Sequence, residues 1–98
     1  MDKIKVLIAD DHRVVREGLA AILKTKEDLH IVGEAQDGME AVEKAKALVP
    51  DVILMDVSMP RMGGVEATRQ IKREFPHIGI VALTMYEEQQ YKIGRAHV

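Results

Sequence analysis

Short apolar runs alternate with longer amphipathic segments along the chain. Residues 4–9 are nearly all apolar and stop at Asp10-Asp11, which predicts a strand buried on both faces. Similar runs predict three more strands: residues 29–35 with a bulge at Gly33, residues 52–55 ending on Asp56, and residues 78–83 ending on Thr84. Each predicted strand therefore ends where the polarity changes abruptly.

The segments between these strands have helical spacing. We expect helices over residues 12–26, with Asp11 as the N-cap, over 39–48, over 65–75, and from residue 87 to residue 91. Alternating strands and helices predict a parallel sheet with helices on both faces. With right-handed crossovers, the predicted fold class is α/β, a doubly wound parallel sheet.

Composition narrows the class of protein without naming a ligand. The chain has 98 residues, which predicts one domain, and its net charge of −2 does not indicate nonspecific binding to nucleic acid or membranes. It has no cysteine, so neither a disulfide nor thiolate chemistry is expected. The N-terminal apolar run is too short for a signal peptide or a membrane span. We therefore expect a soluble, cytoplasmic protein.

The candidate chemistry lies at the ends of the predicted strands. In an open parallel sheet, ligands bind beyond the carboxyl ends of the strands, where this chain has Asp10, Asp11, Asp56 and Thr84. If the first and third strands are neighbours, three carboxylates converge, and a hard, oxygen-seeking ion such as Mg²⁺ would relieve their repulsion.

These residue types suit phosphoryl transfer. A carboxylate beside Mg²⁺ can attack phosphorus and form an aspartyl phosphate. The central Asp56 is the predicted acceptor, Asp11 a direct metal ligand, and Asp10 a ligand through water. The Thr84 hydroxyl would contact a phosphoryl oxygen.

Four segments in this order resemble the receiver domain of bacterial response regulators. They are residues 6–12 (VLIADDH), 15–19 (VREGL), 50–64 (PDVILMDVSMPRMGG) and 82–86 (ALTMY). The resemblance covers about residues 3–91 and is closest to the subgroup with a LuxR-type C-terminal helix-turn-helix. It implies a flavodoxin-like receiver fold with strand order 2-1-3-4.

The resemblance also implies a function in a two-component phosphorelay. A sensor histidine kinase would pass a phosphoryl group to Asp56, with Mg²⁺ held by Asp10, Asp11, Asp56 and the backbone carbonyl of Ser58. Thr84 would move toward the phosphate on activation, and Pro60 would shape the pocket. The parent protein would bind DNA only through its C-terminal domain, and homodimerisation of that parent is compatible with the resemblance.

The resemblance has clear limits. A fifth strand, a fifth helix, a phosphate-pairing lysine and a switch aromatic have no counterpart here, so residues 1–91 are interpreted as an incomplete receiver domain. Residues 92–98 fit neither the helical pattern nor the family, and 93–98 (IGRAHV) is the translation of a common sequencing-adapter read. We interpret that tail as non-native. A bare fourth edge strand also predicts a poorly soluble product.

Simpler interpretations of the same residues exist. Asp10 and Asp11 could form a helix cap, Asp56 could be a turn residue, and His12 fits a surface helix N-terminus better than a metal ligand. Gly63 and Gly64 are expected to use positive φ in a tight turn.

Two other functional classes fit the chain less well. A dehalogenase-like phosphatase needs an acid two residues after its nucleophile, where this chain has Ser58 or His12. A nucleotide-binding module needs a glycine-rich phosphate loop, which is absent from the sequence. A phosphoacceptor switch, rather than an enzyme, is the prediction.

Overall fold

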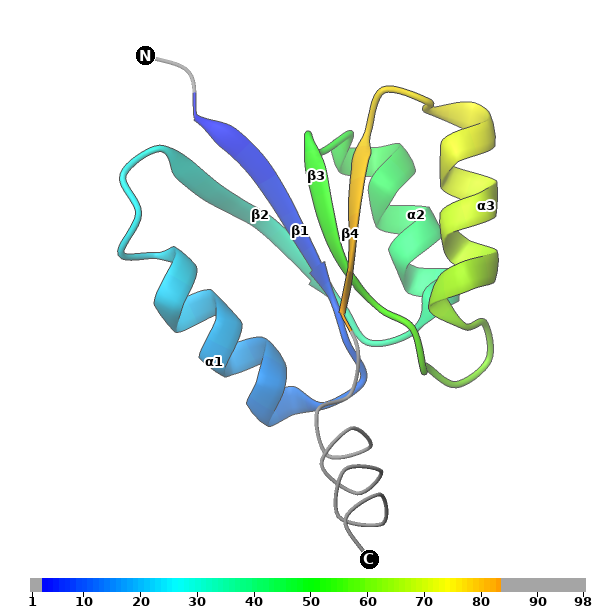
Figure 1. Cartoon of the computed structure of the whole chain (residues 1–98), viewed down its shortest axis with the longest axis horizontal. Coiled ribbons are helices and arrows are strands. Elements are labelled where there is room, and N and C mark those ends of the chain that lie inside the picture. Colours follow the sequence, from blue (N-terminus) through cyan, green and yellow to red (C-terminus); the bar gives the residue numbers. More distant parts are fainter. Residues whose placement is uncertain (1–2, 84–98) are drawn as a thin grey trace, which may run out of the picture.

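The computed structural model describes residues 3–83, which form a parallel sheet covered by helices on both faces (Figure 1). The elements in chain order are β1 (Ile4–Ala9), α1 (Arg13–Leu23), β2 (Leu29–Ala35), α2 (Gly38–Leu48), β3 (Val52–Asp56), α3 (Gly64–Glu74) and β4 (Gly79–Leu83). The sheet order is β2-β1-β3-β4. The predicted fold class and strand order are therefore confirmed. Thr84 and the helix predicted over 87–91 lie outside the described residues.

The apolar residues 6–9 of β1 are buried on both faces of the sheet. Leu7 and Ala9 pack in the layer covered by α2 and α3. Val6 and Ile8 pack with Ala20 in the layer covered by α1. Because successive side chains of a strand point to opposite faces, the covered part of a central strand between two helical layers is apolar at every position, and Lys5 lies at the exposed N-terminal end of β1.

The irregularity expected in the second strand is present. Val6 pairs with Ile31 whereas Leu7 pairs with Gly33, so Val32 has no counterpart on β1. A Cβ on Gly33 would lie 2.9 Å from a methyl carbon of Leu48. The glycine thus allows α2 to pack closely where the strand bulges.

The predicted start of the first helix was wrong. The helix begins at Arg13 with His12 as N-cap, and the side chain of His12 makes no capping hydrogen bond. Asp11 does not cap it, because the turn is made one residue earlier: the His12 N–H donates to Asp10 Oδ1 over 2.8 Å. The helix also ends at Leu23, earlier than expected, and the Thr25 hydroxyl donates to the Ile22 carbonyl there.

The reason predicted for Gly63 and Gly64 was also wrong. No glycine among residues 3–83 has positive φ, and the left-handed residue of this loop is Arg61, with φ of 64°. A Cβ on Gly64 would lie 2.1 Å from the Asp56 carbonyl oxygen. The glycine is therefore required by close backbone packing between α3 and the end of β3.

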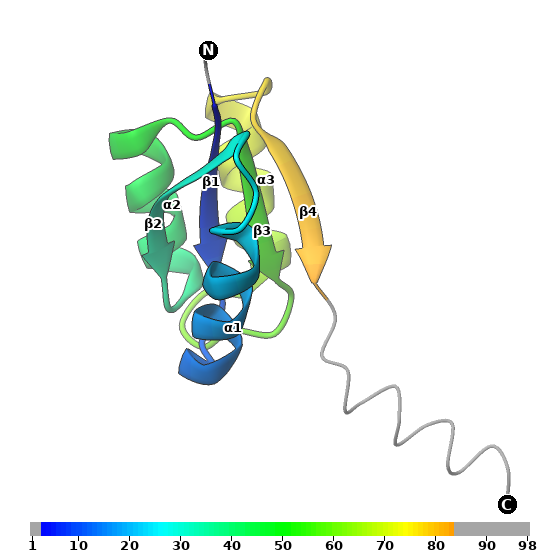
Figure 2. The same cartoon turned by 90° about the vertical axis from the view of Figure 1, so that its left-hand side faces the viewer.

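Strand β4 lies at one side of the described sheet, farthest from β2 (Figure 2). Its burial is partial, and Val81 is 49% exposed. Exposed apolar edge strands promote association between chains. The poor solubility expected from the sequence is consistent with this exposure and stays a prediction. Each described helix has 11 residues, and none of them is long and apolar enough to cross a membrane.

Candidate functional site

The parallel pairing of β1 with β3 brings the acidic residues together. Ala9 pairs with Met55, so the residues that follow, Asp10 and Asp56, emerge side by side at the carboxyl edge of the sheet. One ligand atom from each of Asp10, Asp11, His12 and Asp56 lies within 4.8 Å of the others. The structure therefore brings together the three carboxylates that the sequence placed at strand ends.

Asp56 is the most perturbed member of this cluster. It is fully buried, with 0% exposure, and Asp10 is only 1% exposed. Burial first, and then the nearby charges of Asp10 and Asp11, raise the pKa of Asp56 to about 6, although the Ser58 N–H hydrogen bond opposes the change. A carboxyl group in this setting resists ionisation unless a positive charge arrives.

One oxygen of Asp56 has no partner. Oδ1 accepts a hydrogen bond from the Ser58 N–H at 3.3 Å, whereas Oδ2 is buried and has no hydrogen-bond partner among residues 3–83. Buried polar atoms are rarely left unsatisfied. An orphaned carboxylate oxygen beside two further carboxylates fits an oxygen-seeking divalent cation such as Mg²⁺.

His12 takes part in the cluster more closely than expected. Its Nδ1 lies 3.0 Å from Asp10 Oδ1 and 3.0 Å from Asp11 Oδ1. The hydrogen bond to Asp10 and the charges of the carboxylates raise the pKa of His12. The residue does stand at a helix N-terminus with a half-exposed ring, as predicted. Protonation of this ring would offset part of the local negative charge.

Sequence reasoning missed Arg16. Its Nη1 donates to the Asp10 carbonyl oxygen at 2.7 Å, and its Nε donates to Glu34 at 3.2 Å. The guanidinium thereby links the backbone at the end of β1, at Asp10, to Glu34 of β2. Its position one helical turn after Asp11-His12 was the available signal.

The remaining predicted site residues are Ser58, Pro60 and Thr84. Ser58 is an exposed residue of the loop that follows β3, two residues after Asp56, and its N–H donates to Asp56 Oδ1. Pro60 lies in the same loop, and its carbonyl accepts the Met62 N–H. Thr84 is outside the described residues, so its predicted contact with phosphate stays a prediction.

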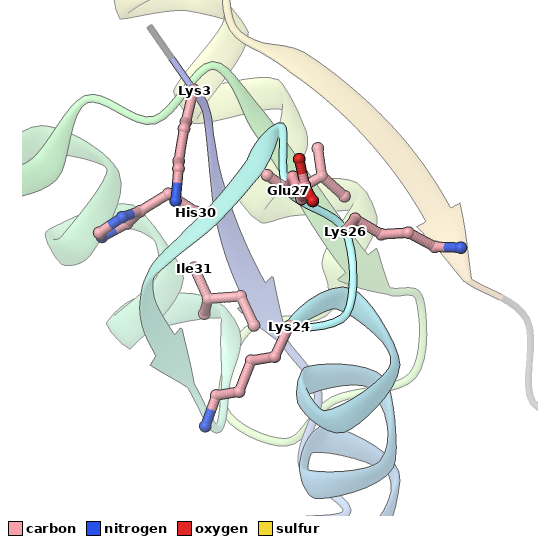
Figure 3. A pocket seen from close by; sticks show the side chains of 7 residues that line it. Lys3, Lys24, Lys26, Glu27, His30 and Ile31 are labelled. Carbon is pink, nitrogen blue, oxygen red and sulfur yellow. The ribbon is translucent and has the colours of Figure 1, made fainter. Parts of the chain in front are cut away.

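A cavity of about 660 Å³ lies at the opposite end of the sheet, at the start of β1 and β2 (Figure 3). Its lining includes Lys3, Lys24, Lys26 and His30. In Figure 3 the side chains of Lys24 and Lys26 point in different directions, so their ammonium groups do not converge. This cavity has no cluster of carboxylates and is separate from the acidic site.

Comparisons with known proteins agree with this geometry. The family model described as "Response regulator receiver domain" matches residues 6–97. The response regulator protein VraR of Staphylococcus saprophyticus is 52% identical over 85 residues, covering 87% of this chain and 41% of that protein. The response regulator GacA of Pseudomonas syringae pv. syringae is 49% identical over 88 residues, covering 90% and 41%. The chain spans about two fifths of these relatives.

Solved structures show the same fold. The response regulator domain of Thermotoga maritima CheB has a TM-score of 0.81 and 41% identity, covering 84% of this chain and 60% of that chain. RcsB from Salmonella enterica serovar Typhimurium, bound to the promoter rprA in the presence of the phosphomimetic BeF3−, has a TM-score of 0.78 and 35% identity, covering 85% and 70%. Both similarities cover most of residues 3–83.

Proposed function

The chain belongs to the family of response regulator receiver domains, and on that premise we propose that it is a phosphoacceptor switch in which Asp56 receives the phosphoryl group. The observation that carries this proposal is the environment of Asp56. Its carboxylate is fully buried at the end of β3, lies beside Asp10 and Asp11, and has an oxygen without a partner in the described chain. A buried carboxylate whose ionised form is stabilised by a nearby cation is suited to act as the nucleophile in metal-assisted phosphoryl transfer.

In this proposal the donor is a phosphohistidine on a sensor histidine kinase. An oxygen of the ionised Asp56 attacks phosphorus, the bond between phosphorus and the donor's imidazole nitrogen breaks, and its electron pair returns to the imidazole. The product is an acyl phosphate on Asp56, which water later hydrolyses slowly to the free carboxylate and phosphate. Ser58, two residues after Asp56, has no carboxyl group to accelerate that hydrolysis.

The chain's own residues would hold Mg²⁺ in the following way. Asp11, Asp56 and the backbone carbonyl of Ser58 would be direct ligands, and Asp10 would bind through water. When bound, the ion neutralises charge on the transferring group and lowers the pKa of Asp56. Asp10 also orients His12 through two hydrogen bonds to one carboxylate oxygen, and Thr84 would contact a phosphoryl oxygen.

We place this chain in a longer protein that controls transcription. In that longer protein a C-terminal DNA-binding domain of the LuxR type would act as the output, and the parent protein would act as a homodimer. Two observations support this: the chain covers only 41% of VraR and GacA, and a two-component response regulator of the LuxR family is 33% identical to it. RcsB, a relative in structure, has been solved bound to a promoter. A cytoplasmic location follows from this role, since the kinase's phosphohistidine and the DNA must both be accessible.

The test is phosphorylation by acetyl phosphate with MgCl₂, followed by intact mass. We expect a single phosphate adduct that disappears in Asp56→Asn and in the presence of a chelator. Asp51→Asn is the control, because Asp51 is an exposed aspartate at the other end of β3. An adduct of equal yield in Asp56→Asn would refute the acceptor assignment.

A further inference from the structure

The loop between β3 and α3, residues 57–63, carries Ser58 and has an unusual backbone conformation. Arg61 adopts a φ of 64°, a left-handed conformation that residues other than glycine rarely take. Such a residue persists only where the surrounding contacts hold it. The contacts that hold Arg61 therefore contribute to the placement of this loop, together with the packing of Met59 in the core.

Asp37, at the N-terminus of α2, supplies the first of these contacts. Its Oδ2 accepts hydrogen bonds from Arg61 Nη2 at 2.5 Å and from Arg61 Nε at 3.1 Å. Its Oδ1 accepts the Glu40 N–H at 2.8 Å and so caps the helix. Asp37 is 4% exposed. Because both oxygens are used, the carboxylate has little freedom to move.

The first residue of α2, Gly38, supplies the second contact. A Cβ on Gly38 would lie 2.0 Å from the Met62 carbonyl oxygen, so the helix backbone lies directly against the loop backbone. Met62 in turn packs against the core beneath α2 and α3. The loop is thus held at two successive residues, 61 and 62, by the N-cap and the first residue of α2, 37 and 38.

We propose that Arg61 is a positioning residue that sets the placement of the loop carrying Ser58 beside Asp56. It does so through a set of contacts, here called the α2–loop clamp, formed by Asp37, Gly38, Arg61 and Met62. The inference rests on the proposed function, because Ser58 matters through the Mg²⁺ site. The polar partner of the Arg61 side chain is Asp37, which lies outside the acidic cluster. Arg61 acts through the backbone of residues 58–61, since a loop of seven residues anchored at residues 61 and 62 leaves Ser58 little independent freedom.

Hydrogen exchange of the metal-free chain tests the clamp directly. In Arg61→Ala we expect faster exchange, by roughly tenfold or more, at the amides of Ser58, Met62 and Gly64, because their local bonds lie in or beside the loop. Arg69→Ala is the matched control. Both arginines carry an exposed side chain, 61% for Arg61 and 59% for Arg69, and each pairs with one carboxylate.

The same variants are then titrated with MgCl₂ alone by calorimetry. We expect Arg61→Ala to weaken Mg²⁺ binding roughly tenfold, the effect usual for residues that orient metal ligands. Arg69→Ala should bind as the unchanged chain does. Arg61→Lys, which keeps the charge but loses the forked donor, should give intermediate exchange and affinity, and it serves if Arg61→Ala does not fold.

The outcomes separate the two proposals. Unchanged loop exchange in both Arg61 variants, or equal effects of Arg61→Ala and Arg69→Ala, would overturn the clamp even if Asp56 takes phosphate. Faster loop exchange confined to the Arg61 variants would support the clamp even if acetyl phosphate leaves the chain unmodified, in which case the proposed function alone is refuted. Exchange within α1 should stay unchanged in every variant, which shows that the fold is retained.

Discussion

The substitution Asp56→Asn should stabilise the metal-free chain at neutral pH. Asp56 is fully buried beside Asp10 and Asp11, and one of its oxygens has no partner in residues 3–83. Above its pKa the folded chain must therefore hold a buried, repelled carboxylate, whereas the unfolded chain solvates it. Asparagine has nearly the same shape and no charge, so it removes this penalty.

The size of the effect follows from the pKa. Burial and the neighbouring carboxylates raise the pKa of Asp56 from its ordinary 3.8 to about 6. Each pH unit of difference corresponds to about 1.4 kcal/mol, so ionising Asp56 destabilises the fold by roughly 3 kcal/mol above pH 6. Because the pKa of Asp56 is raised in the folded state, the free energy of unfolding is not reduced by Asp56 below pH 3.8. The part linked to protonated Asp56 is lost as the pH rises through about 6.

The assay is urea unfolding with a chelator present, at several pH values between about 4 and 8. At the upper end, Asp56→Asn should unfold at a urea concentration higher by about 1–3 M, because the stability of a small domain falls by about 1–3 kcal/mol per M of urea. The gain should shrink toward the lower end, where Asp56 is protonated in the folded chain. Asp28→Asn, which removes the same charge from an exposed residue, is the control.

Two results would refute this reasoning. One is an Asp56→Asn variant no more stable than the unchanged chain at the upper end of the pH range. The other is a gain in stability that does not vary with pH, because a packing or hydrogen-bonding effect of asparagine would not titrate. Addition of MgCl₂ should narrow the difference by stabilising only the chain that retains Asp56.

Four further substitutions test the packing of the loop, one exposed position of α1 and the cap of α2. In urea unfolding, Gly64→Ala should lower the free energy of unfolding by roughly 3 kcal/mol, because its Cβ would lie 2.1 Å from a backbone oxygen. Gly63→Ala should change it by less than about 1 kcal/mol, because the nearest atom to its Cβ would be 3.4 Å away. Gly18→Ala, in α1 with nothing within 4 Å of the added carbon, should raise the melting temperature and contribute roughly 0.5–1 kcal/mol. Asp37→Ala should cost roughly 1–2 kcal/mol at neutral pH through the lost helix cap. The Glu40 N–H first, and then Arg61, lower the pKa of Asp37, so its contribution is present above the ordinary pKa of 3.8 and is lost as the pH falls through the folded value. Equal melts of Gly63→Ala and Gly64→Ala, or a loss from Asp37→Ala that persists undiminished in acid, would contradict these expectations.

Local pattern was enough to predict most of the fold. The run from Ile4 to Ala9 is apolar at every position but Lys5, and only a central parallel strand between two helical layers buries such a run. The bounds of β1 and β2 match the predicted ranges, because each run is ended by polar or turn-forming residues. Helix ends were less accurate, since Asp10, rather than Asp11, binds the His12 amide.

The acidic residues of the site were visible in the sequence for a related reason. An aspartate directly after a buried strand has no place in the core, so it must face the carboxyl edge of the sheet. The local pattern identifies Asp10 and Asp11 at the end of one strand and, separately, Asp56 at the end of another. It does not show that they meet, because their meeting depends on β1 and β3 being neighbours, which is a property of the sheet order.

The contacts that tune the site were decided by the tertiary structure alone. Arg16 reaches the carbonyl of Asp10, and Arg61 pairs with Asp37 across 24 residues of sequence. No local pattern predicts these pairs, because an arginine side chain can reach many partners and the packing of elements selects one of them. The sequence by itself determined the strands, the helices and the acids at the strand ends. Only the packing of α2 against the β3–α3 loop determined which arginine holds that loop, since that choice depends on which backbones come within contact distance.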